Sequence, residues 1–307
     1  MHLRLGRRYQ IAGMNRMTNR GDGVAVVGEA DPLRAVRTYY DVTTERSFLS
    51  GWSAEGYGLH FGLDGPGVET HAQSLRATND AVAEALALAD GARCLDAGCG
   101  VGGTAIDLAQ RRGVEVLGVT LSTRQAALAR RFADEAGVGG RVRFAVADYG
   151  ATGLAEGSFD AVWALESFCH AIDPRAVLGH LVGLLRPGGR FACIDMFRGD
   201  GGDPANARDL CEGWVLPALD RRDALARLAG EVGLAAVQSI DLTQRVLRSA
   251  ETLLPLARAQ QMRVEFERRL AGGTDEVMAG HVRGALGCAR GFLDGAVTYG
   301  LVVGVKA

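Results

Sequence analysis

The sequence predicts an α/β protein in which a mostly parallel sheet is covered by helices on both faces. Between residues 92 and 197, short apolar runs alternate with amphipathic helical patterns, which is typical of parallel strands joined by helical crossovers. The chain of 307 residues is long enough for one large domain with a sizeable cap. Its 43 glycines indicate many tight turns or close backbone approaches.

The strand and helix patterns of this region follow in a regular order. We expect five strands, at residues 92–97, 114–120, 142–148, 159–165 and, after a turn at 186–189, 190–197. We expect intervening helices at residues 101–113, 122–137 and 173–185. Ser122 and Gln125 fit a capping box at the start of the second helix. Asp173 and Pro174 give the third helix an N-cap and a first residue.

The regular alternation stops after residue 198. Residues 203–233 and 245–293 show mostly helical patterns, whereas 234–243 and 295–307 are expected strands. Because a long helical insertion separates two late strands, we expect it to cap the carboxyl edge of the sheet, where open α/β sheets bind ligands. The expected organisation is an arm at 1–30, a helical substrate-cover segment at 31–75, a ligand-binding core at 76–200, and the remaining strands with the cap insertion (about 245–293) at 201–307.

Composition and charge exclude several classes of function. The formal net charge of −2 gives no reason to expect nucleic acid or an anionic membrane as a partner. No apolar run reaches the ~18 residues of a membrane span, and the basic N-terminus lacks the apolar core of a signal peptide. The six cysteines form no C-x-x-C pair, so we expect a reduced, cytoplasmic protein without a disulfide framework or a metal site.

A glycine-rich loop follows the first expected strand. In "LDAGCGVGGT", Gly98, Gly100 and Gly103 fit the pattern G-x-G-x-x-G, which lets a ligand approach the backbone beside a helix N-terminus. A nicotinamide dinucleotide also requires an acid about 20 residues further on, but the second strand ends in "GVTLS". Asp96, just before the loop, can meet a cationic group. The loop therefore favours a ligand with a cationic group over NAD.

Several ordered motifs resemble one known family. "LDAGCGVGG", "GVTLSTRQ", Asp148 after the third strand and "LLRPGGR" together resemble the class I S-adenosylmethionine (SAM) methyltransferases over roughly residues 80–200. The resemblance implies a Rossmann-like class I methyltransferase fold with a seven-stranded, mostly parallel sheet. It also implies SAM as cofactor and S-adenosylhomocysteine as product. The missing acid after the second strand departs from the broad family pattern, but not from the subgroup with G-x-T/S-L-S.

The resemblance assigns the cofactor contacts residue by residue. It places Asp96, Gly98 and Gly100 against the methionine and ribose parts of SAM, and Asp148 against the adenine amino group. For Gly102 and Gly103, ligand contact and close helix–strand packing both remain open. The full set of cofactor-binding residues that the resemblance implies is Asp96, Gly98, Gly100, Thr120, Leu121, Gln125, Asp148 and Tyr149.

A second resemblance points to the substrate. Residues 39–62, "ALESFCHA" and "GAVTYGLVVGVKA" resemble the corresponding segments of sterol, tocopherol and prenyl C-methyltransferases. Within these segments we expect Glu166, His170 and Tyr39 to be the catalytic residues. The substrate-binding residues that we expect are Tyr40, Trp52, Tyr57, His60, Trp214 and Tyr299. The aromatic residues among them can equally be ordinary core residues.

The expected chemistry gives these residues definite tasks. An alkene carbon that takes up a methyl group becomes a carbocation, which aromatic faces can stabilise by about 2 kcal/mol each when desolvated. A base must then remove a proton, unless the cation first cyclises, and Glu166 and His170 are the candidates. Cys169 is unsuited as a nucleophile, because methyl transfer needs no covalent intermediate. We find no D-D-x-x-D run or basic cluster, which favours a neutral terpenoid or prenylated aromatic over a free prenyl diphosphate.

Alternative functions remain open at this stage. An O- or N-methyltransferase of a natural product would use the same fold, as would a SAM-binding protein that cyclises its substrate or regulates without methylating. An NAD(P) oxidoreductase is disfavoured by the second strand end. We expect a hydrophobic small-molecule substrate, closed over by cap residues such as Trp214, Leu216 and Met262. Self-association into a homo-oligomer through the arm or the cap is a further expectation.

Overall fold

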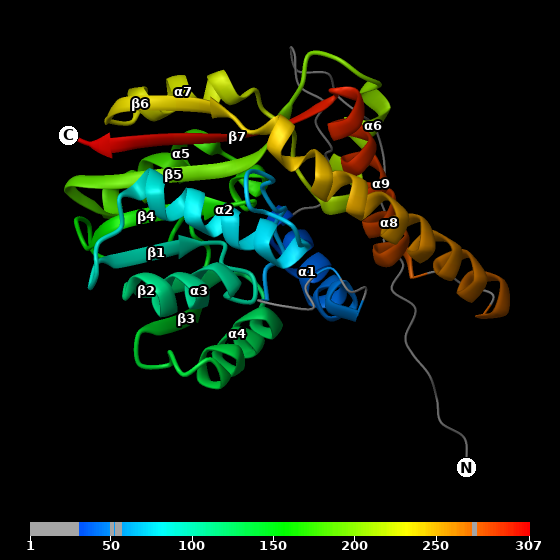
Figure 1. Cartoon of the computed structure of the whole chain (residues 1–307), viewed down its shortest axis with the longest axis horizontal. Coiled ribbons are helices and arrows are strands. Elements are labelled where there is room, and N and C mark those ends of the chain that lie inside the picture. Colours follow the sequence, from blue (N-terminus) through cyan, green and yellow to red (C-terminus); the bar gives the residue numbers. More distant parts are fainter. Residues whose placement is uncertain (1–30, 50–51, 53–56, 272–274) are drawn as a thin grey trace.

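A mixed seven-stranded sheet forms the centre of the described part of the chain (Figure 1). The structure is a computed structural model that describes residues 31–49, 52, 57–271 and 275–307. The strands follow the order β3-β2-β1-β4-β5-β7-β6, and β7 runs antiparallel to both of its neighbours. Their bounds are β1 Arg93–Ala97, β2 Glu115–Thr120, β3 Val142–Val146, β4 Phe159–Leu165, β5 Leu185–Arg198, β6 Leu234–Asp241 and β7 Val297–Lys306.

Helices cover both faces of this sheet and extend beyond one edge. Their bounds are α1 Pro32–Leu49, α2 His71–Leu86, α3 Gly103–Arg112, α4 Thr123–Glu135, the short 3₁₀ helix η1 Phe168–His170, α5 Pro174–Leu184, α6 Pro204–Trp214, α7 Arg222–Glu231, α8 Thr243–Ala271 and α9 Glu276–Asp294. Among the helices that the structure describes, none is long and apolar enough to cross a membrane.

The two hydrophobic cores follow from the alternation of side chains along the strands. On β4, Trp163 packs into the core under α2, α3 and α4, whereas Val162 and Ala164 pack into the core under α5 and α7. Strands that are buried on both faces require a continuous apolar run, and "FDAVWAL" supplies one. The predicted α/β architecture is confirmed.

The helices α6, α8 and α9 pack together beside the carboxyl ends of β1, β4 and β5, and α1 contacts both α9 and α4 (Figure 1). Helices α6 and α9 approach closely, because Gly213 and Gly284 leave no side chain between the two backbones. The distal part of α8 projects past the body of the molecule, and Met262 is 66% exposed there. The expectation that Met262 closes over the substrate is therefore wrong.

Three local expectations differ from the structure. "RPGG" is not a separate turn, because β5 begins at Leu185 and the register with β4 shifts between Phe159 and Ala161. Within the helical segment expected at 31–75, α1 ends at Leu49, and residues 57–70 are not helical. Gln125 does not complete a capping box, because its side chain is drawn away to other partners. The predicted arm at 1–30 lies outside the described residues.

Candidate active site

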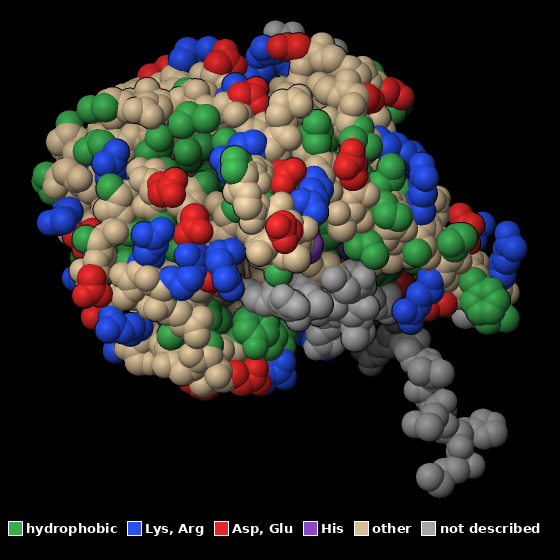
Figure 2. All heavy atoms as spheres, in the orientation of Figure 1, with side chains coloured by type: hydrophobic (Ala, Val, Ile, Leu, Met, Phe, Trp, Pro, Cys, Tyr) green, Lys and Arg blue, Asp and Glu red, His purple; other side chains and the backbone are tan. Residues whose placement is uncertain are grey.

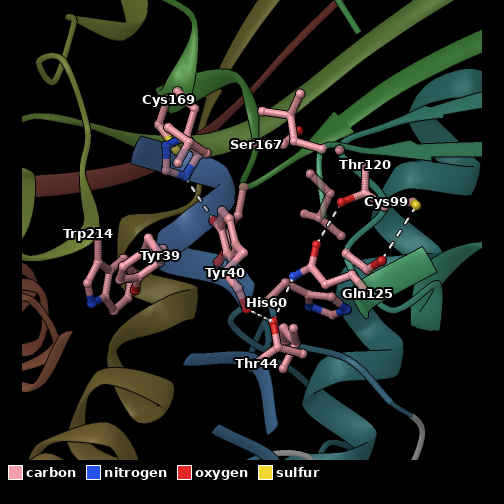
Figure 3. Close-up of a pocket in the computed structure, with 18 of the residues that line it drawn as sticks. Tyr39, Tyr40, Thr44, His60, Cys99, Thr120, Gln125, Ser167, Cys169 and Trp214 are labelled. Atoms are coloured by element: carbon pink, nitrogen blue, oxygen red, sulfur yellow. Dashed lines mark hydrogen bonds between the residues drawn. The ribbon is translucent and has the colours of Figure 1, made fainter. Parts of the chain in front are cut away.

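A cavity of about 390 Å³ opens at the carboxyl edge of the sheet, between the strand ends, α1 and the cap helices. Figure 3 shows Tyr39 and Trp214 on one side of it and Thr120 and Gln125 on the other, with Tyr40 between them. The cavity is therefore continuous from the glycine-rich loop to the cap. Its size falls in the range of small-molecule sites.

The glycine-rich loop brings the ends of β1 and β4 together. Gly98 has a positive φ of 86°, and a side chain at this position would overlap Ser167. The Ser167 hydroxyl donates to the backbone oxygen of Ala97 at 2.5 Å. Only glycine meets both requirements without strain. By contrast, a side chain on Gly102 would strike Phe144, so packing explains that glycine, whereas Gly103 both lines the cavity and lies against the backbone of Tyr57.

Asp96 is a buried carboxyl group on the cavity wall. It is 3% exposed, and burial raises its pKa to about 7. A buried acid of this kind loses its proton and becomes negatively charged when a cation binds beside it. This end of the cavity can therefore accept a cationic group.

The end of β2 is tied to α1 by side-chain hydrogen bonds. Thr120 donates to the Gln125 side chain at 2.7 Å, and the Gln125 amide donates to Thr44 of α1 at 3.1 Å. Ser122 caps α4 and also donates to Asp41 of α1 at 2.5 Å. Figure 3 shows the chain of contacts from Thr120 through Gln125 to Thr44. Helix α1 thus covers this part of the cavity.

The loop after β3 presents a carboxylate and a tyrosine. One Asp148 oxygen, Oδ1, accepts from the backbone N–H of Gly150 at 2.7 Å, which fixes the side chain on the cavity wall. The Tyr149 hydroxyl donates to the backbone oxygen of Ser167 at 2.7 Å. The loop is therefore joined to the end of β4, and Asp148 retains a second oxygen for a ligand.

Glu166 is the central acid of the substrate side. Its Oε1 atom accepts from the backbone N–H of Phe61 and from the Tyr299 hydroxyl, both at 2.6 Å. Burial raises the pKa of Glu166 to about 8, although these two hydrogen bonds lower it. The residue holds a left-handed φ of 49°, an uncommon conformation for a side chain of this kind. Its backbone N–H donates to Ile194 at 2.8 Å, which fixes this conformation.

Asp195 on β5 holds the turn that follows Glu166. Its carboxylate accepts from the backbone N–H groups of Cys169 at 2.9 Å and Met196 at 2.8 Å. Burial raises the pKa of Asp195 to about 6, and its charge raises the pKa of Glu166 further. Burial also raises the pKa of the Cys169 thiol well above its ordinary value, so a thiolate nucleophile does not form here.

Two tyrosine–histidine pairs join α1 to the rest of the site. The Tyr40 hydroxyl and Nε2 of His170 are 2.8 Å apart, and the Tyr39 hydroxyl and Nδ1 of His281 are 2.7 Å apart. Burial lowers the pKa of each histidine to about 4 and raises the pKa of each tyrosine well above its usual value. Both pairs are therefore neutral over the physiological pH range.

Aromatic rings line much of the remaining wall. The Phe61 ring contacts Trp52 edge to face at 5.5 Å and stacks beside Trp214 at 6.4 Å. Tyr57 stacks on Phe132 at 4.0 Å. His60 turns Nδ1 toward the backbone oxygen of Phe61 at 2.9 Å. The substrate side is thus an apolar chamber with few polar groups.

The cavity brings together nearly all residues that the sequence suggested. Each predicted cofactor-binding and catalytic residue lines it, as do Tyr40, Trp52, Tyr57, His60 and Trp214. Tyr299 is the exception, because it is fully buried behind the wall and reaches the site only through Glu166. Sequence reasoning missed Phe61, Asp195 and His281. The pair "HF" at 60–61 lies in the segment that resembles the C-methyltransferases and could have indicated Phe61. No sequence pattern indicated Asp195 or His281.

The charges on the cavity wall restrict its ligands. No lysine or arginine lines the cavity among the described residues. In the same part of the chain, no group of three or more histidine, cysteine or acidic side chains is placed to hold a metal ion. Three features lie at the carboxyl edge of this sheet: the glycine-rich loop, Asp96 near the end of β1 and Asp148 after β3. Together they define a Rossmann-like protein for a nucleoside-type cofactor.

Comparisons with known proteins place the chain in a family. The Methyltransferase domain family matches residues 95–193. The chain is 31% identical over 227 residues to methyltransferase GfsG of Streptomyces halstedii, a match that covers 72% of this chain and 80% of that protein. It is also 31% identical over 213 residues to 24-methylenesterol C-methyltransferase 2 of Oryza sativa subsp. japonica, covering 67% and 57% of the two chains. The match thus spans little more than half of the rice protein.

Solved structures share the fold. The [4+2]-cyclase SpnF superposes with a TM-score of 0.76 at 23% identity, over 90% of this chain and 97% of the cyclase. A geranyl diphosphate methyltransferase, in complex with GPP and sinefungin, gives a TM-score of 0.72 at 21% identity, over 90% and 100% of the two chains. The chain therefore belongs to the class I SAM-dependent methyltransferases, and the predicted family, fold and cofactor class are confirmed.

Proposed function

We propose that this protein transfers a methyl group from SAM to a carbon of a neutral, isoprenoid-bearing small molecule. The observation that carries the proposal is the Glu166 carboxyl group, fixed by Tyr299 and Phe61 on the wall of an aromatic chamber whose described residues include no lysine or arginine. A base and aromatic faces are what a reaction through a carbocation requires. The similarity to the sterol C-methyltransferase of rice supports carbon as the methylated atom.

The cofactor side fits SAM on three observations. Burial raises the pKa of Asp96, and a cationic amino group beside it would lower this pKa and favour the carboxylate. Gly98 leaves the loop backbone bare, and Asp148 has an oxygen free for an amino group of adenine. Thr120, Leu121, Gln125 and Tyr149 would flank the nucleoside. When bound, SAM supplies an electrophilic methyl group on a positively charged sulfur.

The chain's own residues would position and then deprotonate the acceptor. Apolar walls hold an alkene dry and in one orientation, which is the main requirement for an in-line displacement. The faces of Tyr39, Tyr40 and Trp214 would stabilise the positive charge that develops on the acceptor carbon. The Glu166 carboxylate would take the proton from the neighbouring carbon, whose C–H electron pair then forms a new double bond. Ring closure before this proton loss is an alternative outcome of the same cation.

The absence of lysine and arginine from the described cavity walls supports an uncharged acceptor. A diphosphate needs cationic side chains or a metal ion to offset its charge. The solved geranyl diphosphate methyltransferases were crystallised with that charged substrate, in one case with Mg²⁺. The described walls of this cavity offer no equivalent counter-charge, so we propose a neutral terpenoid or a prenylated aromatic compound.

The replacement Glu166→Gln tests the proposal. It removes the base but keeps hydrogen-bonding atoms for Tyr299 and Phe61, so turnover should fall about 10²–10⁴-fold. Binding of S-adenosylhomocysteine, measured by calorimetry, should change less than about threefold. If cofactor binding fell as much as turnover, Glu166 would be a cofactor or structural residue and the proposal would fail.

A second candidate is O-methylation. It is favoured by the neutral His281 imidazole on the cavity wall, which could take the proton of an acceptor hydroxyl. In that reaction the label from SAM would appear on oxygen, and Glu166→Gln would have little effect. Determination of the methylated atom separates the two candidates.

A further inference from the structure

The cap end of the cavity carries polar groups that C-methylation does not require. His281 of α9 and Gln260 of α8 line the cavity, and Tyr39 of α1 pairs with His281. His281 is partly buried and lines the cavity. Within the described part of the chain, the Nε2 atom of His281 and the Gln260 amide form no hydrogen bond. These atoms are therefore available to a ligand.

The Tyr39–His281 pair always presents one donor and one acceptor. If the tyrosine donates to Nδ1, then Nε2–H is the free donor and the phenol oxygen the free acceptor. If Nδ1–H donates to the tyrosine, then the phenol O–H is the free donor and Nε2 the free acceptor. A hydroxyl group, which also donates once and accepts, matches either arrangement. The Gln260 amide adds a further donor and acceptor.

The second tyrosine–histidine pair does not offer the same site. In the Tyr40–His170 pair, Nε2 of His170 is occupied by Tyr40, and Nδ1 is fully buried. That pair holds α1 on the turn after β4. Of these two pairs, only Tyr39–His281 can serve a ligand through its histidine.

We propose that Tyr39, His281 and Gln260 form a subsite that binds an uncharged hydroxyl group of the acceptor. The inference rests on the proposed function and defines its substrate further, as an isoprenoid alcohol or a prenylated hydroxy-aromatic compound. A buried polar subsite in an apolar chamber rejects a ligand that lacks the matching group, because the protein atoms would remain unpaired.

The position of the subsite orients the substrate. His281 stacks beside Trp214 at 6.3 Å, and Trp214 stacks beside Phe61 at 6.4 Å. The backbone of Phe61 in turn donates to Glu166. Two ring contacts therefore separate His281, which would hold the hydroxyl end of the substrate, from Phe61, which holds Glu166. The apolar chain of the substrate extends between these two ends. One anchored end selects which alkene carbon reaches Glu166.

Ligand binding to the S-adenosylhomocysteine complex tests the subsite. The probes are farnesol, farnesyl methyl ether and farnesyl diphosphate, and the readout is quenching of tryptophan fluorescence. The ether cannot donate a hydrogen bond, so we expect farnesol to bind about tenfold more tightly than the ether. The diphosphate should bind more weakly than farnesol. In His281→Phe, which keeps a ring beside Trp214, affinity for farnesol should fall about tenfold while affinity for the ether stays within about twofold.

Matched variants make the test specific. His281→Gln retains a donor and an acceptor and should restore part of the preference for farnesol. Tyr40→Phe should weaken alcohol and ether alike, because its hydroxyl serves His170. Any of three results would overturn the subsite. The first is an equal loss of affinity for farnesol and for the ether in His281→Phe. The others are tighter binding of the diphosphate than of farnesol, and no binding of any probe. Since the readout is binding, the result does not depend on whether methyl is transferred to carbon.

Discussion

The Glu166 carboxyl group is subject to opposing influences. Burial and the neighbouring Asp195 favour its protonated form, whereas the hydrogen bonds from Tyr299 and Phe61 favour the carboxylate. With a pKa of about 8, most of the free protein carries the protonated acid at pH 7. A base must be charged, so turnover at saturating cofactor should rise with pH up to about 8 and then level.

The replacement Tyr299→Phe tests this balance. Loss of the hydroxyl removes a hydrogen bond to the charged form, worth roughly one pKa unit. The pKa of Glu166 should therefore rise, and the pH at which turnover levels should move upward by about one unit. A pH–rate profile measures this shift, which loss of packing alone would not produce.

The control for this prediction is the same substitution in a Glu166→Gln background. There the residual activity should show no such shift. If turnover of Tyr299→Phe levels at the same pH as turnover of the unchanged protein, Glu166 is not the group that titrates.

The roles of two important side chains could not be predicted from the sequence. Tyr299 lies in β7 and His281 in α9, and each is far along the chain from the residue that it contacts, Glu166 or Tyr39. Their roles arise from contacts across the sheet and between helices, over 133 and 242 residues of sequence separation. Local motifs do not record such contacts, which is why Tyr299 was expected on the cavity wall.

At the scale of the element, close helix packing builds the cap end of the site. A side chain at Gly213 would overlap the backbone of α9 at Gly280 and Gly284. Gly284 in turn lies against the Trp214 ring, which lines the cavity. The position of Trp214 therefore depends on the absence of side chains where α6 and α9 meet.

The replacement Gly213→Ala should destabilise the protein by about 1–3 kcal/mol, because backbone atoms cannot move aside as a flexible side chain can. Calorimetry should show a melting temperature lowered by about 2–4 °C for each kcal/mol. The matched control is Gly230→Ala in α7, where an added methyl group meets nothing. It should leave stability unchanged or raise it by about 0.5–1 kcal/mol. Equal effects of the two substitutions would contradict this account of the cap.

The capping box shows how tertiary contacts override a local pattern. Ser122 caps α4 as the sequence predicts, and its hydroxyl accepts from the Gln125 backbone at 3.0 Å. The Gln125 side chain bonds to Thr120 and Thr44 instead of the cap. Gln125, which the local pattern predicts to cap its own helix, thus connects β2 to α1 over the cofactor side.

At the scale of the whole molecule, the sheet was predictable because each strand carries its own pattern. The apolar runs of β1, β4 and β5 and the glycine-rich loop sufficed for the fold and the cofactor side. The substrate side was less predictable, because α1, α6, α8 and α9 converge on it from separate parts of the chain. Amphipathic patterns indicate that a helix buries one face, but not which neighbour it meets. Met262 was assigned to the wrong face for this reason.

Neither sign of charge dominates the face of the molecule shown in Figure 2. Positive and negative side chains are interspersed on the face shown in Figure 2, and the formal net charge of the chain is −2. The described walls of the cavity, by contrast, carry acids and aromatic rings but no lysine or arginine.

The central claim is methyl transfer to carbon, and the position of a labelled methyl group tests it most directly. The purified protein is incubated with SAM carrying a ¹³C-methyl group and with a panel of neutral isoprenoid alcohols, and the product is examined by NMR. We predict a new carbon–methyl group beside a displaced double bond or a new ring, and about 10²–10⁴-fold less product with Glu166→Gln. A label on oxygen or nitrogen, or cyclisation of the substrate without incorporation of the label, would contradict the account.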